Sequence, residues 1–111
     1  VFINKFCKFF SHTKTGSDII IGDDVAIAMG VTLTTHTHQI SSGKRRAERK
    51  TVFRPIVIGD GCWIGANVTI LPGVTIGRGT VVGAGSVVVK GLDANSVYVG
   101  NPARKIRQLE G

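Results

Sequence analysis

Aromatic residues are scarce in this chain, which has only five Phe, one Trp and one Tyr among 111 residues. Binding of single-stranded nucleic acid usually combines basic residues with aromatic rings on which the bases stack, so the low aromatic content argues against that class of partner. Long apolar runs are also missing, and none approaches the roughly 18 residues of a membrane-spanning helix. We therefore expect no nucleic-acid partner and no membrane span.

Cysteine is nearly absent as well, with only Cys7 and Cys62 in the chain. The first residues lack the basic start, apolar stretch and cleavage site of a secretory signal, so a disulfide is the less favoured interpretation. We expect reduced thiols and a cytoplasmic protein. The chain opens at Val1 and not at a methionine, which leaves missing N-terminal residues as an open alternative.

Acidic residues are half as numerous as basic ones, seven against 14, which gives a net charge of +7. An excess of this size predicts attraction to anions. Charge alone does not choose among nucleic acid, phosphorylated sugars and the phosphates of a cofactor.

Glycine, in contrast, is abundant at 15 residues, and it accompanies a repeat of six residues. Aliphatic side chains recur at this interval in the second half of the chain, at Ile58, Ile64, Ile70, Ile76, Val82 and Val88. A second small or aliphatic side chain stands two places before each of them. A spacing of two is strand alternation, whereas a helix would place residues six apart about 120° from one another. The repeat therefore predicts short strands.

Short strands punctuated by glycine every six residues are typical of a parallel β-helix, in which three strands close a triangular coil of about 18 residues. The first half keeps the register more loosely, at Ile3, Phe9, Thr15, Ile21, Ile27 and Leu33. We predict an all-β fold, with a single β-helix domain over residues 1–111 and about five coils. Both cysteines fall on inward positions, so we expect them in the core.

The register breaks once, because Leu33 and Ile58 are separated by 25 residues, which is not a multiple of six. We predict an extruded loop over residues 39–54. This segment is polar and basic, and it contains Lys44, Arg45, Arg46, Arg49 and Lys50. Long loops in compact domains are often functional. Near the end, Asn101-Pro102 interrupts the repeat, and we expect a cap over residues 101–111 formed by a short helix or strand.

Several motifs carry a resemblance to a known family: Ile58-Gly59-Asp60-Gly61-Cys62-Trp63-Ile64-Gly65, Ile70-Leu71-Pro72-Gly73-Val74-Thr75-Ile76-Gly77, Val82-Gly83-Ala84-Gly85-Ser86 and Gly100-Asn101-Pro102-Ala103. The chain resembles the hexapeptide-repeat acetyltransferases. Thr35-His36-Thr37-His38, followed by the basic loop, is most similar to the maltose, galactoside and nodulation sugar O-acetyltransferases. The resemblance implies a left-handed β-helix, a homotrimer with active sites between subunits, acetyl-CoA as co-substrate, a saccharide-type acceptor and no metal.

The resemblance also implies a catalytic histidine. Transfer of an acetyl group to a hydroxyl needs a base with a pKa near neutrality, which histidine supplies. His38 matches the position of the family's catalytic base, and His36, two residues earlier, is the alternative. We expect the His38 side chain to project outward at the root of the loop, between inward positions Thr37 and Gln39.

Other family positions imply the rest of the site. Ala66 follows the Trp63-Ile64-Gly65 motif and has no hydroxyl, so only its backbone N–H could stabilise an oxyanion. Trp63 resembles a residue that lines the pantetheine arm, with packing at the edge of the core as the alternative. The positions that resemble cofactor-binding or substrate-binding residues are Gly65, Ala66 and Ala84 for the pantetheine, Lys90, Arg104, Lys105 and Arg107 for the phosphates, and Asn4 for the acceptor.

Other functions stay open at this point. The same fold and base could serve acetylation of serine or of an antibiotic hydroxyl. A γ-carbonic-anhydrase-like zinc site uses three histidines, and this chain has His12, His36 and His38, but the family's remaining histidine position is Gly61-Cys62 here. A non-catalytic basic assembly module is the alternative of another class.

Overall fold

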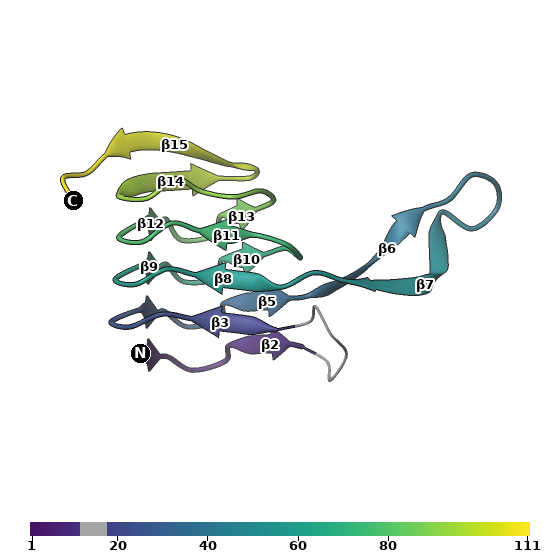
Figure 1. The fold of residues 1–111 in the computed structure, drawn as a ribbon, viewed down its shortest axis with the longest axis horizontal. Coiled ribbons are helices and arrows are strands. Elements are labelled where there is room, and N and C mark those ends of the chain that lie inside the picture. The colour runs from purple at the N-terminus through teal and green to yellow at the C-terminus, as the bar shows by residue number, and fades with distance from the viewer. Residues whose placement is uncertain (12–17) are drawn as a thin grey trace.

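The six-residue repeats form short parallel strands that stack in three faces of a β-helix (Figure 1). The computed structural model describes residues 1–11 and 18–111. Face A contains β1 (Phe2–Ile3), β4 (Ala26–Ile27), β9 (Trp63–Ile64), β12 (Val81–Val82) and β14 (Ser96–Gly100), with β15 (Ala103–Gln108) added at its edge. Face B contains β2 (Lys8–Phe10), β5 (Thr32–Thr34), β10 (Thr69–Ile70) and β13 (Val87–Val88). Face C contains β3 (Ile19–Ile21), β8 (Ile56–Ile58) and β11 (Thr75–Ile76).

The core is a column of aliphatic side chains at the predicted inward positions. Strand pairing stacks equivalent positions of successive coils, so that Ile27 lies opposite Ile64, and Ile64 lies opposite Val82. All six aliphatic residues of the second-half repeat, from Ile58 to Val88, are at most 1% exposed. Burial of each such side chain stabilises the fold by about 1.5–3 kcal/mol. The predicted all-β fold and its register are confirmed in these coils.

The first coil departs from the prediction. Ile3 and Phe9, both expected to point into the core, are 44% and 36% exposed. They lie at the end of the stack, where no further coil covers them among the described residues. Cys7 is accordingly only half-buried, whereas Cys62 in a middle coil is buried, and both thiols are free. Thr15, the remaining predicted position of this coil, lies outside the described residues.

The extruded loop predicted at residues 39–54 is a β-hairpin. Its strands are β6 (His36–Ile40) and β7 (Ala47–Phe53), which pair antiparallel and project away from the coils (Figure 1). We refer to residues 36–53 as the hairpin. Its root is fixed by the buried Thr35, whose amide donates to Phe10 O at 3.0 Å and whose carbonyl accepts from Arg54 N at 2.7 Å.

The chain ends with a strand that folds back over the last coil. After a cis Asn101-Pro102 bond, β15 runs antiparallel to β14, so the predicted cap at residues 101–111 is a strand and not a helix. The two termini of the chain lie at opposite ends of the stack (Figure 1). Within the described residues, there is no helix of the length and apolarity required to cross a membrane.

Candidate active site

His38 is positioned by the pairing of the two hairpin strands. It lies opposite Thr51, and its Nδ1 is 3.1 Å from the carbonyl oxygen of Lys50. A carbonyl oxygen can only accept a hydrogen bond, so the neutral ring carries its proton on Nδ1 and keeps a lone pair on Nε2. Nε2 is therefore available to accept a proton from a substrate. The backbone of the neighbouring strand selects this tautomer.

The surroundings of His38 differ from our expectation in one respect. We predicted that it would stand between inward positions Thr37 and Gln39, but every residue of β6 is exposed. The reason is that the chain has already left the coils at this point, so the strand has no inward side. His38 is therefore exposed on the first strand of the hairpin.

His36 has different neighbours. Its ring makes an edge-to-face contact with Phe10, with centroids 6.5 Å apart, and a tilted contact with Phe53 at 6.1 Å. Phe53 is also its partner across the two strands. No hydrogen bond to a ring nitrogen of His36 occurs in the described part of the chain, so nothing there selects its tautomer. His36 thus packs against two aromatic rings, whereas His38 is oriented by a backbone carbonyl.

A second group of predicted residues meets on face A and at the corner between faces A and B. The Gly65 amide donates to Val82 O at 2.8 Å, and a Cβ added to Gly65 would lie 2.7 Å from the Ala84 amide nitrogen. Only glycine allows this approach of two coils. Ala66 O accepts from Gly85 N at 2.8 Å, while the Ala66 N–H donates to none of the described residues. Gly65, Ala66 and Ala84 therefore form one small-residue surface.

Trp63 stands beside this surface on the outer side of face A. It pairs with Ala26 in the coil before and with Val81 in the coil after, and 58% of its surface is exposed. Packing at the edge of the core, the alternative interpretation from the sequence, does not fit this exposure. The indole is free to contact a ligand.

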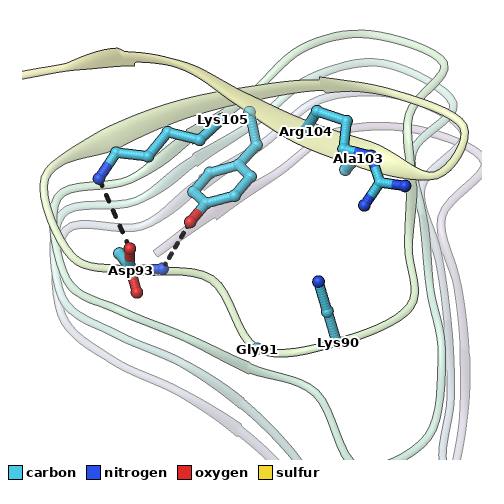
Figure 2. Close-up of a pocket in the computed structure, with 7 residues that line it drawn as sticks. Lys90, Gly91, Asp93, Ala103, Arg104 and Lys105 are labelled. Atoms are coloured by element: carbon cyan, nitrogen blue, oxygen red, sulfur yellow. Dashed lines mark hydrogen bonds and ion pairs between the residues drawn. The ribbon is translucent and has the colours of Figure 1, made fainter.

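Three predicted cationic residues meet at a pocket of about 470 Å³ near the cap (Figure 2). Lys90, Arg104 and Lys105 line it, and Lys90 and Arg104 point into the same space. Lys105 forms an ion pair with Asp93 at 3.5 Å, whereas Lys90 and Arg104 have no ion pair with the described residues. Arg107 lies on β15 with Arg104 and Lys105. It is opposite Val97 of β14 and outside this pocket.

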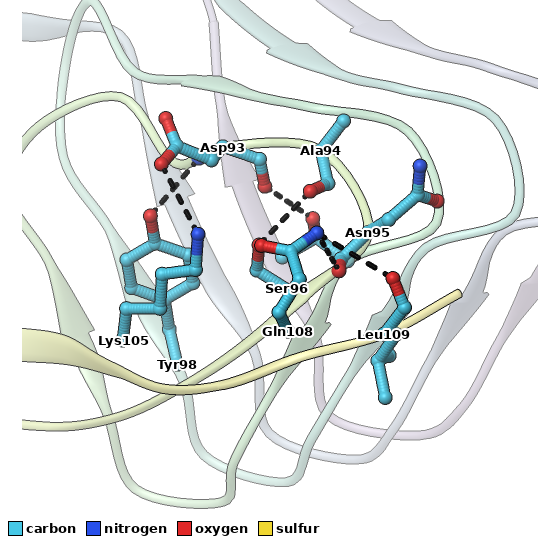
Figure 3. Close-up of polar contacts among 9 residues, drawn as sticks. Asp93, Ala94, Asn95, Ser96, Tyr98, Lys105, Gln108 and Leu109 are labelled. Atoms are coloured by element: carbon cyan, nitrogen blue, oxygen red, sulfur yellow. Dashed lines mark hydrogen bonds and ion pairs between the residues drawn. The ribbon is translucent and has the colours of Figure 1, made fainter. Parts of the chain in front are cut away.

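Polar contacts hold the cap over the last coil and so fix these cations (Figure 3). The Asp93 amide donates to the Tyr98 hydroxyl oxygen at 3.1 Å, and Gln108 Nε2 donates to Asn95 O at 2.9 Å. The Leu109 amide donates to the same Asn95 carbonyl at 2.7 Å. The cap is therefore joined to the last coil by the hydrogen bonds of Gln108 and Leu109 to Asn95, together with the Lys105–Asp93 ion pair.

One chain does not bring all predicted residues together. The hairpin leaves the coils between β5 and β8, which is the corner between faces B and C, whereas the Gly65–Ala66–Ala84 surface lies at the corner between faces A and B. Asn4, the predicted acceptor residue, also lies away from the hairpin, just after β1, and its Oδ1 accepts from Lys5 N at 2.7 Å. The base and the small-residue surface are therefore separated within a chain.

Two other chemistries find no support in the described residues. Cys62 is buried, its Sγ donates to Gly77 O at 3.1 Å, and burial raises the pKa of its thiol, so it does not supply a thiolate nucleophile. Across residues 1–11 and 18–111, no group of three or more His, Cys, Asp or Glu side chains is arranged to hold a metal ion. His12, part of the zinc alternative, lies outside the described residues.

Sequence reasoning missed two contributors to this site. The Lys50 carbonyl that orients His38 is a backbone group, and its contact depends on the strand register, so no residue type signals it. Phe10 lies 26 residues before His36, and only the coil geometry brings the two rings together. Both contacts could have been predicted if the sequence of the insertion had indicated paired strands. Its polar residues do not indicate them.

Comparison with known proteins assigns the family. Residues 55–90 match the family described as bacterial transferase hexapeptide (six repeats), and residues 18–35 match the hexapeptide repeat of succinyl-transferase. The galactoside O-acetyltransferase of Escherichia coli is 45% identical over 91 residues, which cover 82% of this chain and 44% of that protein. The chain spans about half the length of such curated relatives.

Solved structures agree with this assignment. A galactoside acetyltransferase in complex with coenzyme A is 35% identical with a TM-score of 0.78, over 97% of this chain and 55% of that one. A maltose O-acetyltransferase from Clostridium difficile is 35% identical with a TM-score of 0.77, over 98% of this chain and 67% of that one. The left-handed parallel β-helix expected from the sequence is the fold of these proteins. The chain belongs to the hexapeptide-repeat acetyltransferase superfamily.

Proposed function

We propose that this protein is an acetyl-CoA-dependent O-acetyltransferase that acts on a hydroxyl group of a saccharide acceptor, with His38 as general base. The observation that carries the proposal is the contact between His38 Nδ1 and the Lys50 carbonyl, at 3.1 Å, which leaves Nε2 free to take a proton. General base catalysis by a positioned histidine contributes about 10²–10⁴-fold to the rate.

The reaction balances with this single base. Nε2 removes the proton of the acceptor hydroxyl while its oxygen attacks the carbonyl carbon of the thioester. The tetrahedral intermediate then expels the coenzyme A thiolate as the carbon–sulfur bond breaks, and the imidazolium returns its proton to that sulfur. The Ala66 N–H, which has no acceptor among the described residues, would donate to the oxyanion of the intermediate.

Coenzyme A would lie along face A, and the complex of the related galactoside acetyltransferase supports this cofactor. Trp63 would contact the pantetheine arm, and Gly65, Ala66 and Ala84 would allow it close approach, because none of them carries a side chain beyond Cβ. Lys90, Arg104, Lys105 and Arg107 would bind the phosphates at the cap. We place the reaction in the cytoplasm, where thiols stay reduced.

The separation of the two parts of the site within one chain supports a homotrimer. A neighbouring copy would bring its small-residue surface to the hairpin of the first, so that each active site contains residues of two chains. Assembly would also cover exposed apolar side chains such as Ile20 and Ile106, at 53% and 61% exposed. We regard residues 1–111 as one β-helix domain of such a trimer.

A thiol-release assay with acetyl-CoA and a panel of sugars, serine and antibiotic hydroxyls tests this proposal. We expect release that depends on a saccharide, and we expect His38→Ala to lower it about 10²–10⁴-fold. His36→Ala is the matched control, which should retain most of the activity because the ring packs against Phe10 and Phe53. Release with serine or an antibiotic alone would change the acceptor class. Absence of both release and coenzyme A binding would favour a non-catalytic basic module.

A further inference from the structure

The positive charge of the chain is concentrated on the hairpin. Residues 44–50 contain five cations and one anion, Glu48, and all of them are exposed. Arg46 is engaged at the tip, where its Nη1 donates to Ser41 O at 3.2 Å and its carbonyl accepts from Ser41 N at 2.6 Å. The side chains of Lys44, Arg45, Arg49 and Lys50 make no hydrogen bond or ion pair with any described residue. These four cations are therefore free to bind an anion.

Two of the free cations belong to the part of β7 that faces the proposed base. Lys50 supplies the carbonyl that orients His38, and Thr51, which follows it, lies directly opposite His38. Arg49 is two residues from Thr51, a separation of about 7 Å along an extended strand. An acceptor whose hydroxyl reaches His38 Nε2 therefore lies beside the strand that carries Arg49 and Lys50.

The other side of the base offers aromatic surface. Phe10 is 46% exposed and makes an edge-to-face contact with His36, which is itself exposed. An aromatic ring of this kind packs against the apolar face of a sugar ring. In contrast, residues 37–52, which carry the cations, contain no Phe, Tyr or Trp on which nucleic-acid bases could stack. The surroundings of His38 fit a sugar that bears negative charge better than a polynucleotide.

We propose that the acceptor is an acidic saccharide, one that carries carboxylate or phosphate groups, and that Arg49 and Lys50 determine this specificity. The inference rests on the proposed acetyl transfer at His38. The two cations act on binding of the acceptor and not on the chemical step, because neither is the proton acceptor. Their attraction for an anion is screened by salt over about 10 Å at 0.1 M ionic strength.

Binding is the first test, because it does not require catalysis. Oligogalacturonate hexamer, a phosphorylated maltohexaose and neutral maltohexaose are titrated into the native chain by calorimetry, with a single-stranded DNA 20-mer as a fourth probe. We expect both acidic oligosaccharides to bind at least about tenfold more tightly than maltohexaose, with a loss of affinity as salt rises. Preference for one acidic probe would identify carboxylate or phosphate as the group recognised. Tighter binding of the DNA, or equal binding of the neutral sugar, would overturn the proposal.

Paired variants locate the effect. Arg49→Gln combined with Lys50→Gln removes two charges from the hairpin, and Lys5→Gln combined with Arg78→Gln removes two exposed charges from other corners of the coils. We expect the hairpin pair to weaken acidic saccharide binding and to raise KM about tenfold with kcat nearly unchanged, and the control pair to change either by less than about twofold. Equal effects of the two pairs would contradict a role for the hairpin.

The two proposals can fail separately. If thiol release proceeds equally well with acidic and neutral acceptors in native and hairpin variants, acetyl transfer stands and acidic specificity is wrong. If acidic oligosaccharides bind through the hairpin but no acceptor supports thiol release, recognition of the saccharide stands and the proposed reaction is wrong. Circular dichroism of each variant confirms that the β-helix is retained.

Discussion

The coils and the hairpin differ in the burial of their side chains and in the pairing of their strands. In the coils, side chains such as Ile27, Ile64 and Ile70 are fully buried, and each strand pairs with its equivalent in the next coil. In the hairpin, every residue of β6 is exposed, and among residues 1–11 and 18–111 its strand partner is β7 alone. The proposed base lies in the second region, which lacks a core of its own. Stability and chemistry are therefore expected to respond to different substitutions.

Removal of the hairpin should give the largest difference between an effect on activity and an effect on stability. Replacement of residues 37–52 by Asn-Gly keeps the His36–Phe53 pair and supplies a two-residue turn suited to antiparallel strands. We expect thiol release to fall about 10²–10⁴-fold with loss of the base, while the free energy of unfolding in urea changes by less than about 1 kcal/mol. Full-length His38→Ala should show the same loss of activity. Unfolding of the shortened chain would show that the hairpin supports the coils.

A matched pair of isoleucines separates the two regions by stability. Ile64 is fully buried in a middle coil, whereas Ile40 in the hairpin is 87% exposed. We expect Ile64→Ala to lower the free energy of unfolding by about 2–5 kcal/mol, because it leaves a cavity in the column of side chains. Ile40→Ala should change it by less than about 0.5 kcal/mol. Urea unfolding followed by circular dichroism measures both values, and similar losses would contradict the assigned burial.

The reactivity of the two thiols compares the first coil with a middle coil. Cys7 in the first coil is half-buried, whereas Cys62 in a middle coil is buried and burial raises the pKa of its thiol. Because the thiolate is the reactive form, we expect a disulfide reagent at pH 8 to modify Cys7 at least about tenfold faster than Cys62. Cys7→Ala and Cys62→Ala variants assign the two rates. Equal rates would indicate that the middle coils open as readily as the first.

The sequence predicted the coils well because their physics is local and repetitive. A spacing of six residues places Ile58, Ile64 and Ile70 on successive strands, and each becomes buried by the next coil. The prediction failed where a residue depends on a neighbour outside the repeat. Ile3 and Phe9 follow the period but are exposed, because no described coil covers them.

The site was less predictable for a related reason. The motif around His38 identified the candidate base, but the contact with the Lys50 carbonyl depends on the hairpin register, which the polar residues of the insertion do not encode. The cap cations were identified, yet only Lys90, Arg104 and Lys105 share a pocket, because Arg107 lies on the strand beyond it. Periodicity also carried no information on which corner each group occupies.

In the proposed trimer, an active site combines the hairpin of one chain with the small-residue surface of another. Hybrid assemblies of His38→Ala and Ala84→Trp chains test it most directly, since Ala84 is exposed and a bulky residue there would block the cofactor without disturbing the core. Each variant alone should be inactive in thiol release. After mixing and subunit exchange, verified by native mass spectrometry, we expect recovery of about a quarter of the native activity, because each half of the site is intact in half of the chains. Mixed assemblies that remain inactive would contradict a site shared between chains.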